Sequence, residues 1–197
     1  KEYCDKVGIG FMSSVFSIED ARLLKNVVTD YVKIPSFESR NEELINHCSD
    51  LFDHIILSTG TSTTSEITTS ISGIADITLL HCVSSYPCNY DIVNLPRINE
   101  LREIAPSVGF SDHTKGVDVS ILALGYSLDF IEKHFTIDND LPGRDNKFAL
   151  NPLEFKEMTK NISETLKMLN YHGNNAQESE NEIISLYRGR WGKDDYE

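Results

Sequence analysis

Short apolar runs alternate with longer segments of helical periodicity along most of this chain. Each run is rich in Val, Ile, Leu or Phe, which is typical of a buried strand, and in the segments between them apolar residues recur every three or four positions. Strands that alternate with helices favour a parallel sheet covered by helices. We therefore predict an α/β fold with strands at residues 7–12, 31–34, 55–57, 77–82, 108–110 and 130–133.

Residues with helix-capping preferences stand where the predicted helices begin. A Ser, Thr or Asn followed three residues later by an acidic residue favours a helix start. One predicted helix carries the apolar stripe Ala21, Leu24 and Val28, and another, Val117–Leu124, is expected to end with Gly125 in the left-handed conformation. The capping pairs are Ser17 with Asp20, Ser39 with Glu42, Thr63 with Glu66, and Asn151-Pro152 with Glu154.

The spacing of the strands helps to choose between two α/β architectures. The predicted strands begin near residues 9, 31, 54, 77, 108 and 130, so a strand-helix unit recurs with one longer loop. A doubly wound dinucleotide fold would have a glycine-rich phosphate fingerprint after its first strand, and this sequence has none. We therefore predict a partial (β/α)8 barrel of the TIM type, with about six units and with its functional residues where the strands end.

Two histidines follow consecutive predicted strands in the stretch 107–136. Because neighbouring parallel strands end at the same edge of a sheet, His113 and His134 are expected to lie together, where two imidazoles could hold a divalent cation. The alternative is that each is a hydrogen-bonded structural histidine. Strand alternation also predicts that Glu132 points to the same side as His134 and that Lys133 points to the other.

A lysine and several serines also stand at predicted strand ends. Lys33 ends one strand and Ser36 follows it, while Ser14, Ser58 and Ser111 occupy three other strand ends. A lysine among converging hydroxyl groups can hold a phosphate in a protein that is otherwise acidic. The alternative is that the serines are ordinary polar loop residues.

Two carboxylates near these positions are candidate catalytic-site residues. Glu38 lies on the loop after Lys33 and could face the same pocket, or it could be a solvated loop residue. Asp112 directly precedes His113 and could accept a hydrogen bond from an imidazole, which would orient the ring.

Composition and charge narrow the classes of function. The 197 residues include 31 acidic and 18 basic side chains, giving a net charge of −13, so DNA or RNA would be repelled over most of the surface. The sequence has no apolar run as long as a membrane span and no signal-peptide pattern. The cysteines form no Cys-x-x-Cys pair. We therefore expect no nucleic acid or membrane partner and a reducing, cytoplasmic location.

Six motifs in order along the chain resemble those of the sialic acid synthases, also called the N-acetylneuraminate synthase family. Most similar to the family signatures are the Ser-Asp-His-Thr stretch that begins at Ser111 and the Glu-Lys-His-Phe-Thr stretch that begins at Glu132. The resemblance extends from about Gly8 to about Leu169. The other motifs are Lys33–Glu38, Ile56–Gly60, Leu79–Pro87 and, with a poorer fit, Leu141–Asp145.

The resemblance implies a fold and a reaction. The family has an eight-stranded barrel and condenses phosphoenolpyruvate with an N-acyl amino sugar such as N-acetylmannosamine, giving a nine-carbon keto acid and phosphate. It implies that His113 and His134 bind a divalent metal, Mn²⁺ or Mg²⁺, beside the sugar aldehyde, and that Glu38 handles a proton of water or a hydroxyl group. The substrate-binding residues that it implies are Ser14, Lys33, Ser36, Ser58, Ser84, Tyr86, Ser111 and Asp145.

The chain also departs from the family pattern. Arg144 and Asn146 flank Asp145 where relatives usually have Pro and His, so the sugar contacts differ, and neuraminic, legionaminic and pseudaminic precursors all stay open. Two barrel strands, which carry a glutamate and a lysine in relatives, and an antifreeze-like domain that reaches across the family's dimer do not occur in this sequence. We therefore expect a truncated synthase domain at residues 1–172, a polar tail at 173–197, a homodimer, and no catalysis by this chain alone.

Two other interpretations stay open. A non-catalytic homologue could serve as an interaction subunit, which the missing strands favour. Another phosphoenolpyruvate-aldose condensing barrel, such as a keto-deoxy-octulosonate synthase, is a second enzyme candidate. The Ser-Ser-Tyr-Pro stretch from Ser84 and the Glu-Lys-His-Phe-Thr stretch argue against that second candidate.

Overall fold

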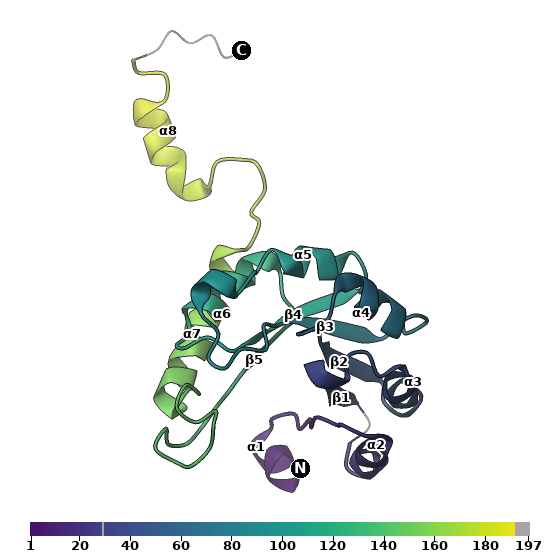
Figure 1. Ribbon diagram of the computed structural model, residues 1–197. Coiled ribbons are helices and arrows are strands. Elements are labelled where there is room, and N and C mark those ends of the chain that lie inside the picture. Colours follow the sequence, from purple (N-terminus) through teal and green to yellow (C-terminus); the bar gives the residue numbers. More distant parts are fainter. Residues whose placement is uncertain (29, 192–197) are drawn as a thin grey trace.

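The computed structural model describes residues 1–28 and 30–191. Within them, five parallel strands form one sheet in sequence order, and each strand pairs with the next. The sheet curls into half of a barrel (Figure 1), so the predicted α/β architecture of the TIM type is confirmed. The strands are β1 (Tyr31–Ile34), β2 (His54–Ser58), β3 (Ile77–His81), β4 (Ser107–Asp112) and β5 (Phe130–Lys133).

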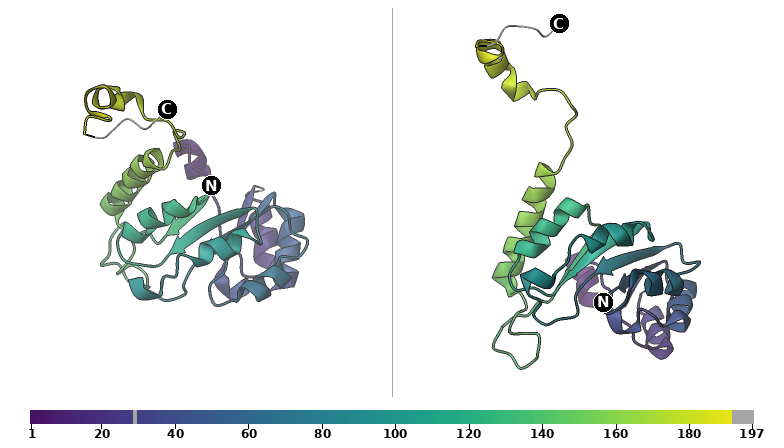
Figure 2. Two further views of the ribbon diagram at one scale, coloured as in Figure 1. Left: turned by 90° about the horizontal axis from the view of Figure 1, so that it is seen from above. Right: turned by 45° about the horizontal axis from the view of Figure 1, so that its top comes forward.

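Helices connect successive strands and cover the convex face of the sheet (Figures 1 and 2). This arrangement follows from parallel pairing, because each connection must return the chain to the starting edge of the sheet. A short helix, α1 (Glu2–Val7), precedes these units and buries none of its residues. The covering helices are α2 (Ile18–Lys25), α3 (Glu42–Leu51), α4 (Thr64–Ser70), α5 (Arg97–Arg102), α6 (Asp118–Ala123) and α7 (Pro152–Met168), with 3₁₀ turns η1 (Ser36–Glu38), η2 (Tyr90–Ile92) and η3 (Leu124–Tyr126).

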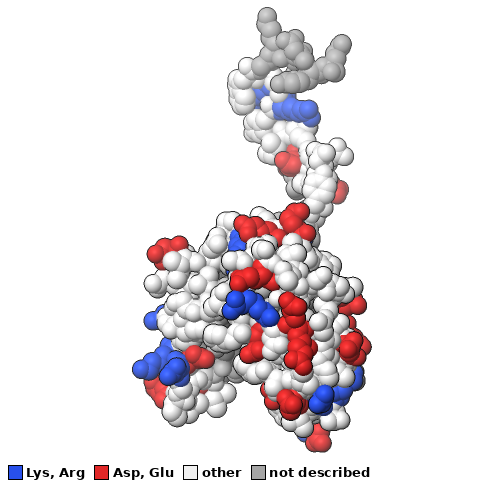
Figure 3. All heavy atoms as spheres, turned by 45° about the vertical axis from the view of Figure 1, so that its right-hand side comes forward, with Lys and Arg blue, Asp and Glu red and all other residues white. Residues whose placement is uncertain are grey.

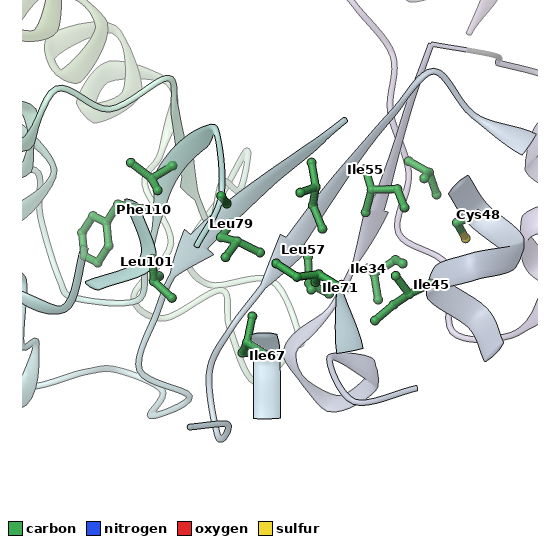
Figure 4. Packing of buried hydrophobic residues seen from close by; sticks show 14 of the residues in the cluster. Ile34, Ile45, Cys48, Ile55, Leu57, Ile67, Ile71, Leu79, Leu101 and Phe110 are labelled. Carbon is green, nitrogen blue, oxygen red and sulfur yellow. The ribbon is translucent and has the colours of Figure 1, made fainter. Parts of the chain in front are cut away.

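Strand alternation divides the side chains of the sheet between two environments. Ile55, Leu79 and Phe110 point toward the helices and pack in one apolar cluster with Leu101 of α5 (Figure 4). Lys33 alternates with two residues of that cluster and lines a cavity at the carboxyl ends of the strands. Burial of the apolar side chains on the convex side therefore determines which polar side chains point to the concave side.

Gly109 of β4 lets the last strand lie close to its neighbour. A Cβ atom at this position would lie 2.5 Å from Leu80 Cδ2 and 2.6 Å from the carbonyl oxygen of Phe130. Any side chain would push β5 away or displace Leu80, so the position requires glycine. This close approach brings the end of β5 toward the end of β4.

Three of the predicted capping pairs are confirmed and one is wrong. Asn41, not Ser39, caps α3, because its side-chain oxygen accepts the N–H of Leu44 at 3.1 Å. Ser39 is instead buried and its hydroxyl bonds to that of Ser62 at 2.8 Å. The Ser39 hydroxyl therefore bonds to the loop that contains Ser62 and does not cap the helix. The confirmed caps are Ser17 on α2, Thr63 on α4 and Asn151 on α7.

The predicted first strand is also wrong. Residues 7–12, all of them described, form no strand, and an isolated bridge between Ser14 and Lys33 is the pairing found beside β1. Gly8 has a positive φ of 76° where α1 ends, and the Ile9 side chain is exposed. The apolar residues of this run thus have no buried surface that would hold them in an extended conformation, and apolar pattern alone does not make a strand.

The helix before β5 ends differently from the prediction. α6 is followed directly by the turn η3, and Gly125 lies inside that turn without a positive φ. Ser127 is the left-handed residue, with φ 55° and ψ 59°. The extra turn moves the helix end two residues further along the chain than the glycine rule predicts.

The chain beyond α7 leaves the barrel half. It contains the turn η4 (Glu178–Glu180) and the helix α8 (Asn181–Tyr187), neither of which has a buried residue, and α8 lies apart from the sheet (Figure 2). The division into a domain at 1–172 and a tail at 173–197 stays a prediction. No helix in the described parts of the chain combines the length and apolar character that crossing a membrane requires.

Candidate active site

A cavity of about 260 Å³ lies at the carboxyl ends of the strands. Lys33 of β1, Ser58 of β2, Ser111 of β4 and Glu132 of β5 line it, as alternation along these strands requires. Polar groups that are far apart in the sequence thus share one wall. The described residues that line it are Lys33, Pro35, Ser36, Phe37, Ser58, Cys82, Tyr86, Ser111, His113, Glu132, Lys133 and His134.

Lys33 is paired with Glu132 inside this cavity. The Lys33 ammonium lies 2.9 Å from each carboxylate oxygen, and the two side chains are 6% and 41% exposed, respectively. Burial opposes ionisation of Glu132, but the charge of Lys33 and hydrogen bonds from Lys33 and Ser111 outweigh it and hold the pKa of Glu132 below its usual value. The cavity therefore contains an ionised carboxylate beside an ammonium group.

Serine hydroxyls line the same cavity. Ser36 Oγ accepts the N–H of Gly60 at 3.1 Å. Ser58 Oγ is buried and has no hydrogen-bond partner among the described residues, which makes it ready to donate to a bound anion. The structure thus brings Lys33, Ser36, Ser58 and Ser111 together, while their role in binding stays a prediction.

Gly60, just after β2, forms a closely packed part of the cavity wall. A Cβ atom here would lie 2.4 Å from Ser84 Oγ, 2.8 Å from Ser36 Oγ and 2.9 Å from Cys82 Sγ. Only glycine lets these three side chains approach so closely. Ser84 therefore packs against Gly60, and it is not among the described residues that line the cavity.

His113 and His134 both line the cavity, and their ring centroids are 5.4 Å apart. His113 Nδ1 lies 2.8 Å from the carbonyl oxygen of Val83. Because a carbonyl can only accept, Nδ1 carries the proton, and Nε2, 3.3 Å from Ser111 Oγ, is the unprotonated nitrogen that can accept a hydrogen bond. Burial is the main reason that the pKa of His113 is below its usual value. A neutral imidazole with a free Nε2 is the form that binds metals.

The two imidazoles could supply two ligands to a divalent cation, and the remaining ligands would have to be water or substrate oxygen atoms. Two imidazoles leave several positions of a Mn²⁺ or Mg²⁺ ion open for such ligands. Within the described residues, no group of three or more His, Cys, Asp or Glu side chains is arranged so that it could hold a metal ion.

Aromatic rings and a wider hollow extend the site outward. The Tyr86 ring centroid lies 4.3 Å from that of His113 and 5.8 Å from that of His134. Asp145 Oδ2 lies 3.6 Å from His134 Nδ1. The structure thus places Tyr86 and Asp145 beside the histidine pair. The outer hollow, of about 980 Å³, is lined by Phe37, Tyr86, His134, Gly143, Arg144, Asp145 and Lys147.

Asp112 does not orient an imidazole, contrary to the sequence prediction. Its carboxylate lies 2.8 Å from the ammonium of Lys133 and accepts the Ser120 hydroxyl at 2.6 Å. Alternation explains the error, because Asp112 and His113 are consecutive and point to opposite sides of the sheet. The orienting acceptor of His113 is the carbonyl of Val83, which local sequence could not indicate.

Ser14 and Glu38 are not among the described residues that line the cavity. Ser14 is exposed in the bridge beside β1. The Glu38 carboxylate accepts a hydrogen bond at 2.8 Å from Nδ2 of Asn41, the residue that caps α3. The local helix start therefore holds this carboxylate, and the arrangement gives no support to its predicted role in proton transfer.

Sequence reasoning missed the partner of Lys33 and part of the cavity wall. Alternation correctly directed Glu132 and His134 into the cavity, but nothing local showed that Glu132 pairs with a lysine 99 residues away. Cys82 also lines the cavity, two positions after Leu80, so continuing the alternation past β3 could have found it.

A barrel half with an ammonium, hydroxyl groups and imidazoles at its strand ends is typical of TIM-type enzymes. The chain belongs to the NeuB family, whose model matches residues 1–174. It is similar to the N,N'-diacetyllegionaminic acid synthase of Campylobacter jejuni, with 34% identity over 194 residues that cover 94% of this chain and 58% of the relative. The chain spans little more than half the length of that curated relative.

Two further comparisons agree with this assignment. The pseudaminic acid synthase of Helicobacter pylori is 36% identical over 174 residues, covering 85% of this chain and 51% of that protein. The crystal structure of an N-acetylneuraminic acid (sialic acid) synthetase from Leptospira borgpetersenii in complex with citrate matches with a TM-score of 0.87 and 33% identity, covering 96% of this chain and 68% of that one. These relatives are synthases of different sugar acids.

Proposed function

We propose that this protein condenses phosphoenolpyruvate with an N-acyl amino sugar, such as N-acetylmannosamine, to form a nonulosonic acid and phosphate. The observation that carries the proposal is the cavity in which Lys33 and three serines face the pair His113 and His134. An anion site and a cation site side by side match the two substrates, one a phosphate ester and the other an aldehyde sugar.

The phosphate of phosphoenolpyruvate would bind Lys33 and the hydroxyl groups of Ser36, Ser58 and Ser111. The protein has a net charge of −13, and acidic side chains are spread over the face shown in Figure 3, so an anion needs a local cation to bind. Lys33 supplies it from a buried position, where a charge-assisted hydrogen bond is strong. The unpartnered Ser58 hydroxyl would gain an acceptor at the same time.

In the reaction, the methylene carbon of phosphoenolpyruvate forms a bond to the aldehyde carbon of the sugar. Water then adds at the carbon that carries the phosphate, and phosphate leaves. A divalent cation, Mn²⁺ or Mg²⁺, held by His113 and His134 would supply Lewis acidity toward the aldehyde oxygen. The cavity residues hold the enol phosphate in attack geometry, and Tyr86 and Asp145 border the side where the sugar would lie.

The proposal is tested by the binding of phosphoenolpyruvate and Mn²⁺ to the 197-residue chain. The 197-residue chain should bind phosphoenolpyruvate and Mn²⁺ in calorimetry, and Lys33→Ala should weaken phosphoenolpyruvate binding while leaving Mn²⁺ binding intact. We expect no turnover by this chain alone, because in the described residues β5 has no further strand on its outer side and the outer edge of β1 carries only the isolated bridge from Ser14. Unchanged phosphoenolpyruvate binding in Lys33→Ala would contradict the anion site.

A non-catalytic interaction subunit is the second candidate function. The exposed apolar side chains Ile9 and Phe11 beside the β1 edge favour it, because such an edge can accept another chain. Measurable phosphate release that depends on N-acetylmannosamine, or on a legionaminic or pseudaminic precursor, would exclude this candidate. The homodimer and the cytoplasmic location are part of the main proposal, and the four free thiols, all in the described residues, are consistent with a reducing location.

A further inference from the structure

A buried ion pair joins the last two strands and reaches α6, although Lys133 also contributes to the lining of the cavity. Asp112 and Lys133 are direct partners in the register of β4 and β5, and the carboxylate lies 2.8 Å from the ammonium. Their side chains are 0% and 1% exposed, respectively. Charged groups this deeply buried require an extensive set of partners.

The partners of this ion pair belong to several elements. The second oxygen of the Asp112 carboxylate accepts the N–H of Thr114 at 2.8 Å, and the first also accepts the Ser120 hydroxyl of α6 at 2.6 Å. The Lys133 ammonium donates to the carbonyl oxygen of Thr114 at 2.6 Å. The pair therefore ties together β4, the loop after it, α6 and β5.

Each member of the pair directly precedes one of the two histidines of the cavity. Adjacent residues are joined by a planar peptide unit that keeps their Cα atoms about 3.8 Å apart. The distance between Asp112 and Lys133 therefore limits the distance between the backbones of His113 and His134. The ring of His113 is oriented separately, by the carbonyl of Val83.

We propose that the Asp112–Lys133 pair is a positioning element that sets the spacing of the His113 and His134 rings and thereby the cation affinity of the site. A role in stability alone does not explain it, because a buried ion pair contributes little net stability compared with apolar residues of the same size. A buried ion pair can instead fix the register of two strands, because Asp112 and Lys133 are opposite each other in only one alignment of β4 and β5. The inference rests on the proposed function for its cation, but the ring spacing can be measured without one.

The test compares a double variant with a matched control. Asp112→Asn with Lys133→Met removes both charges together, so no unpaired charge stays buried. The Asn oxygen can still accept from the Thr114 N–H, and the Asn NH₂ group can donate to the Ser120 hydroxyl oxygen in place of the bond that Asp112 accepts. The control, Lys160→Met with Glu164→Gln, removes an exposed pair on α7. Circular dichroism checks the fold of each variant, NMR of the histidine rings in the metal-free 197-residue chain reports ring placement, and calorimetry with Mn²⁺ reports affinity.

We expect the double variant to fold, to shift the ring signals of both His113 and His134, and to weaken Mn²⁺ binding by about 10- to 100-fold, as loss of an outer partner of a metal ligand does. The control variant should match the wild type in both measurements. Unchanged ring signals of both histidines in a folded double variant would overturn the inference. Absence of Mn²⁺ binding by the wild-type chain would count against the proposed function, whereas the ring signals would still decide the positioning role.

A milder variant covers the case in which the double variant does not fold. Ser120→Ala keeps both charges and removes the 2.6 Å hydrogen bond to Asp112. It should produce a smaller shift of the same ring signals and weaken Mn²⁺ binding by about two- to fivefold, in line with the loss of one hydrogen bond. Ring signals identical to those of the wild type in this variant would also overturn the inference.

Discussion

Two neighbouring residues of β5, Glu132 and Lys133, form two ion pairs with opposite environments. Glu132 points into the cavity and pairs with Lys33 of β1, and its side chain is 41% exposed. Lys133 pairs with Asp112 between β4 and α6, where water is excluded. Strand alternation alone separates the two. Consecutive residues at one strand end can therefore form two kinds of ion pair. The Lys33–Glu132 pair is accessible to a ligand in the cavity, and the buried Asp112–Lys133 pair can fix the alignment of β4 and β5.

Removing one member of the buried pair should have the largest effect. Asp112→Ala leaves the Lys133 ammonium buried without its carboxylate, so the free energy of unfolding should fall by about 3–5 kcal/mol. Urea unfolding followed by circular dichroism measures this change. The double variant Asp112→Asn with Lys133→Met should lose much less stability, and equal losses in the two variants would show that the unpaired charge is not the cause.

Lys33→Ala should affect binding more than stability. The Glu132 carboxylate that it leaves behind is partly solvated, so the stability loss should be small, about 1 kcal/mol. Loss of a charge-assisted hydrogen bond should weaken phosphoenolpyruvate binding by about 10- to 100-fold. Calorimetry and urea unfolding on the same preparation separate the two effects. If Lys33→Ala lost as much stability as Asp112→Ala, the Lys33–Glu132 and Asp112–Lys133 pairs would not differ in their contribution to stability, contrary to this prediction.

His81 is another buried titratable group, and burial favours its neutral form. Its Nε2 lies 2.7 Å from the carbonyl oxygen of Val93, and burial is the main cause of a lowered pKa. The unfolded chain therefore binds a proton first as the pH falls through about 6.5, so the folded state loses stability on acidification.

His81→Gln, which retains a donor for Val93, should make this pH dependence shallower by at most about 1.4 kcal/mol per pH unit, the value for one proton. Urea unfolding between pH 7.5 and 5.5 measures the slope. A variant with the wild-type slope would exclude His81 as a source of the acid sensitivity.

Glu132→Gln should have the smallest effect and the opposite sign. Removing the carboxylate takes a negative charge away from the anion site and frees Lys33, so phosphoenolpyruvate should bind more tightly, by up to about fivefold. Calorimetry at low ionic strength gives the largest difference. Weaker binding would mean that Glu132 holds Lys33 in its binding position rather than competing with the ligand.

Local sequence rules determined most of the sheet and its helix starts. The runs at 31–34 and 130–133 coincide with β1 and β5, and Thr63 and Asn151 cap their helices as predicted. These features depend on interactions between residues within about one helical turn or one strand of each other. A short stretch of sequence is therefore enough to predict them.

The sequence by itself also indicated that Lys33, Ser58, Ser111 and Glu132 point to the same side of the sheet, because alternation along each strand needs only its apolar positions. Tertiary structure alone decided the partners: Lys33 with Glu132, Asp112 with Lys133 and the His113 ring with Val83. It also left residues 7–12 without the strand that their pattern favoured. Each of these outcomes depends on interactions between residues that are far apart in the sequence. A local sequence pattern contains no information about which of these distant groups will come into contact.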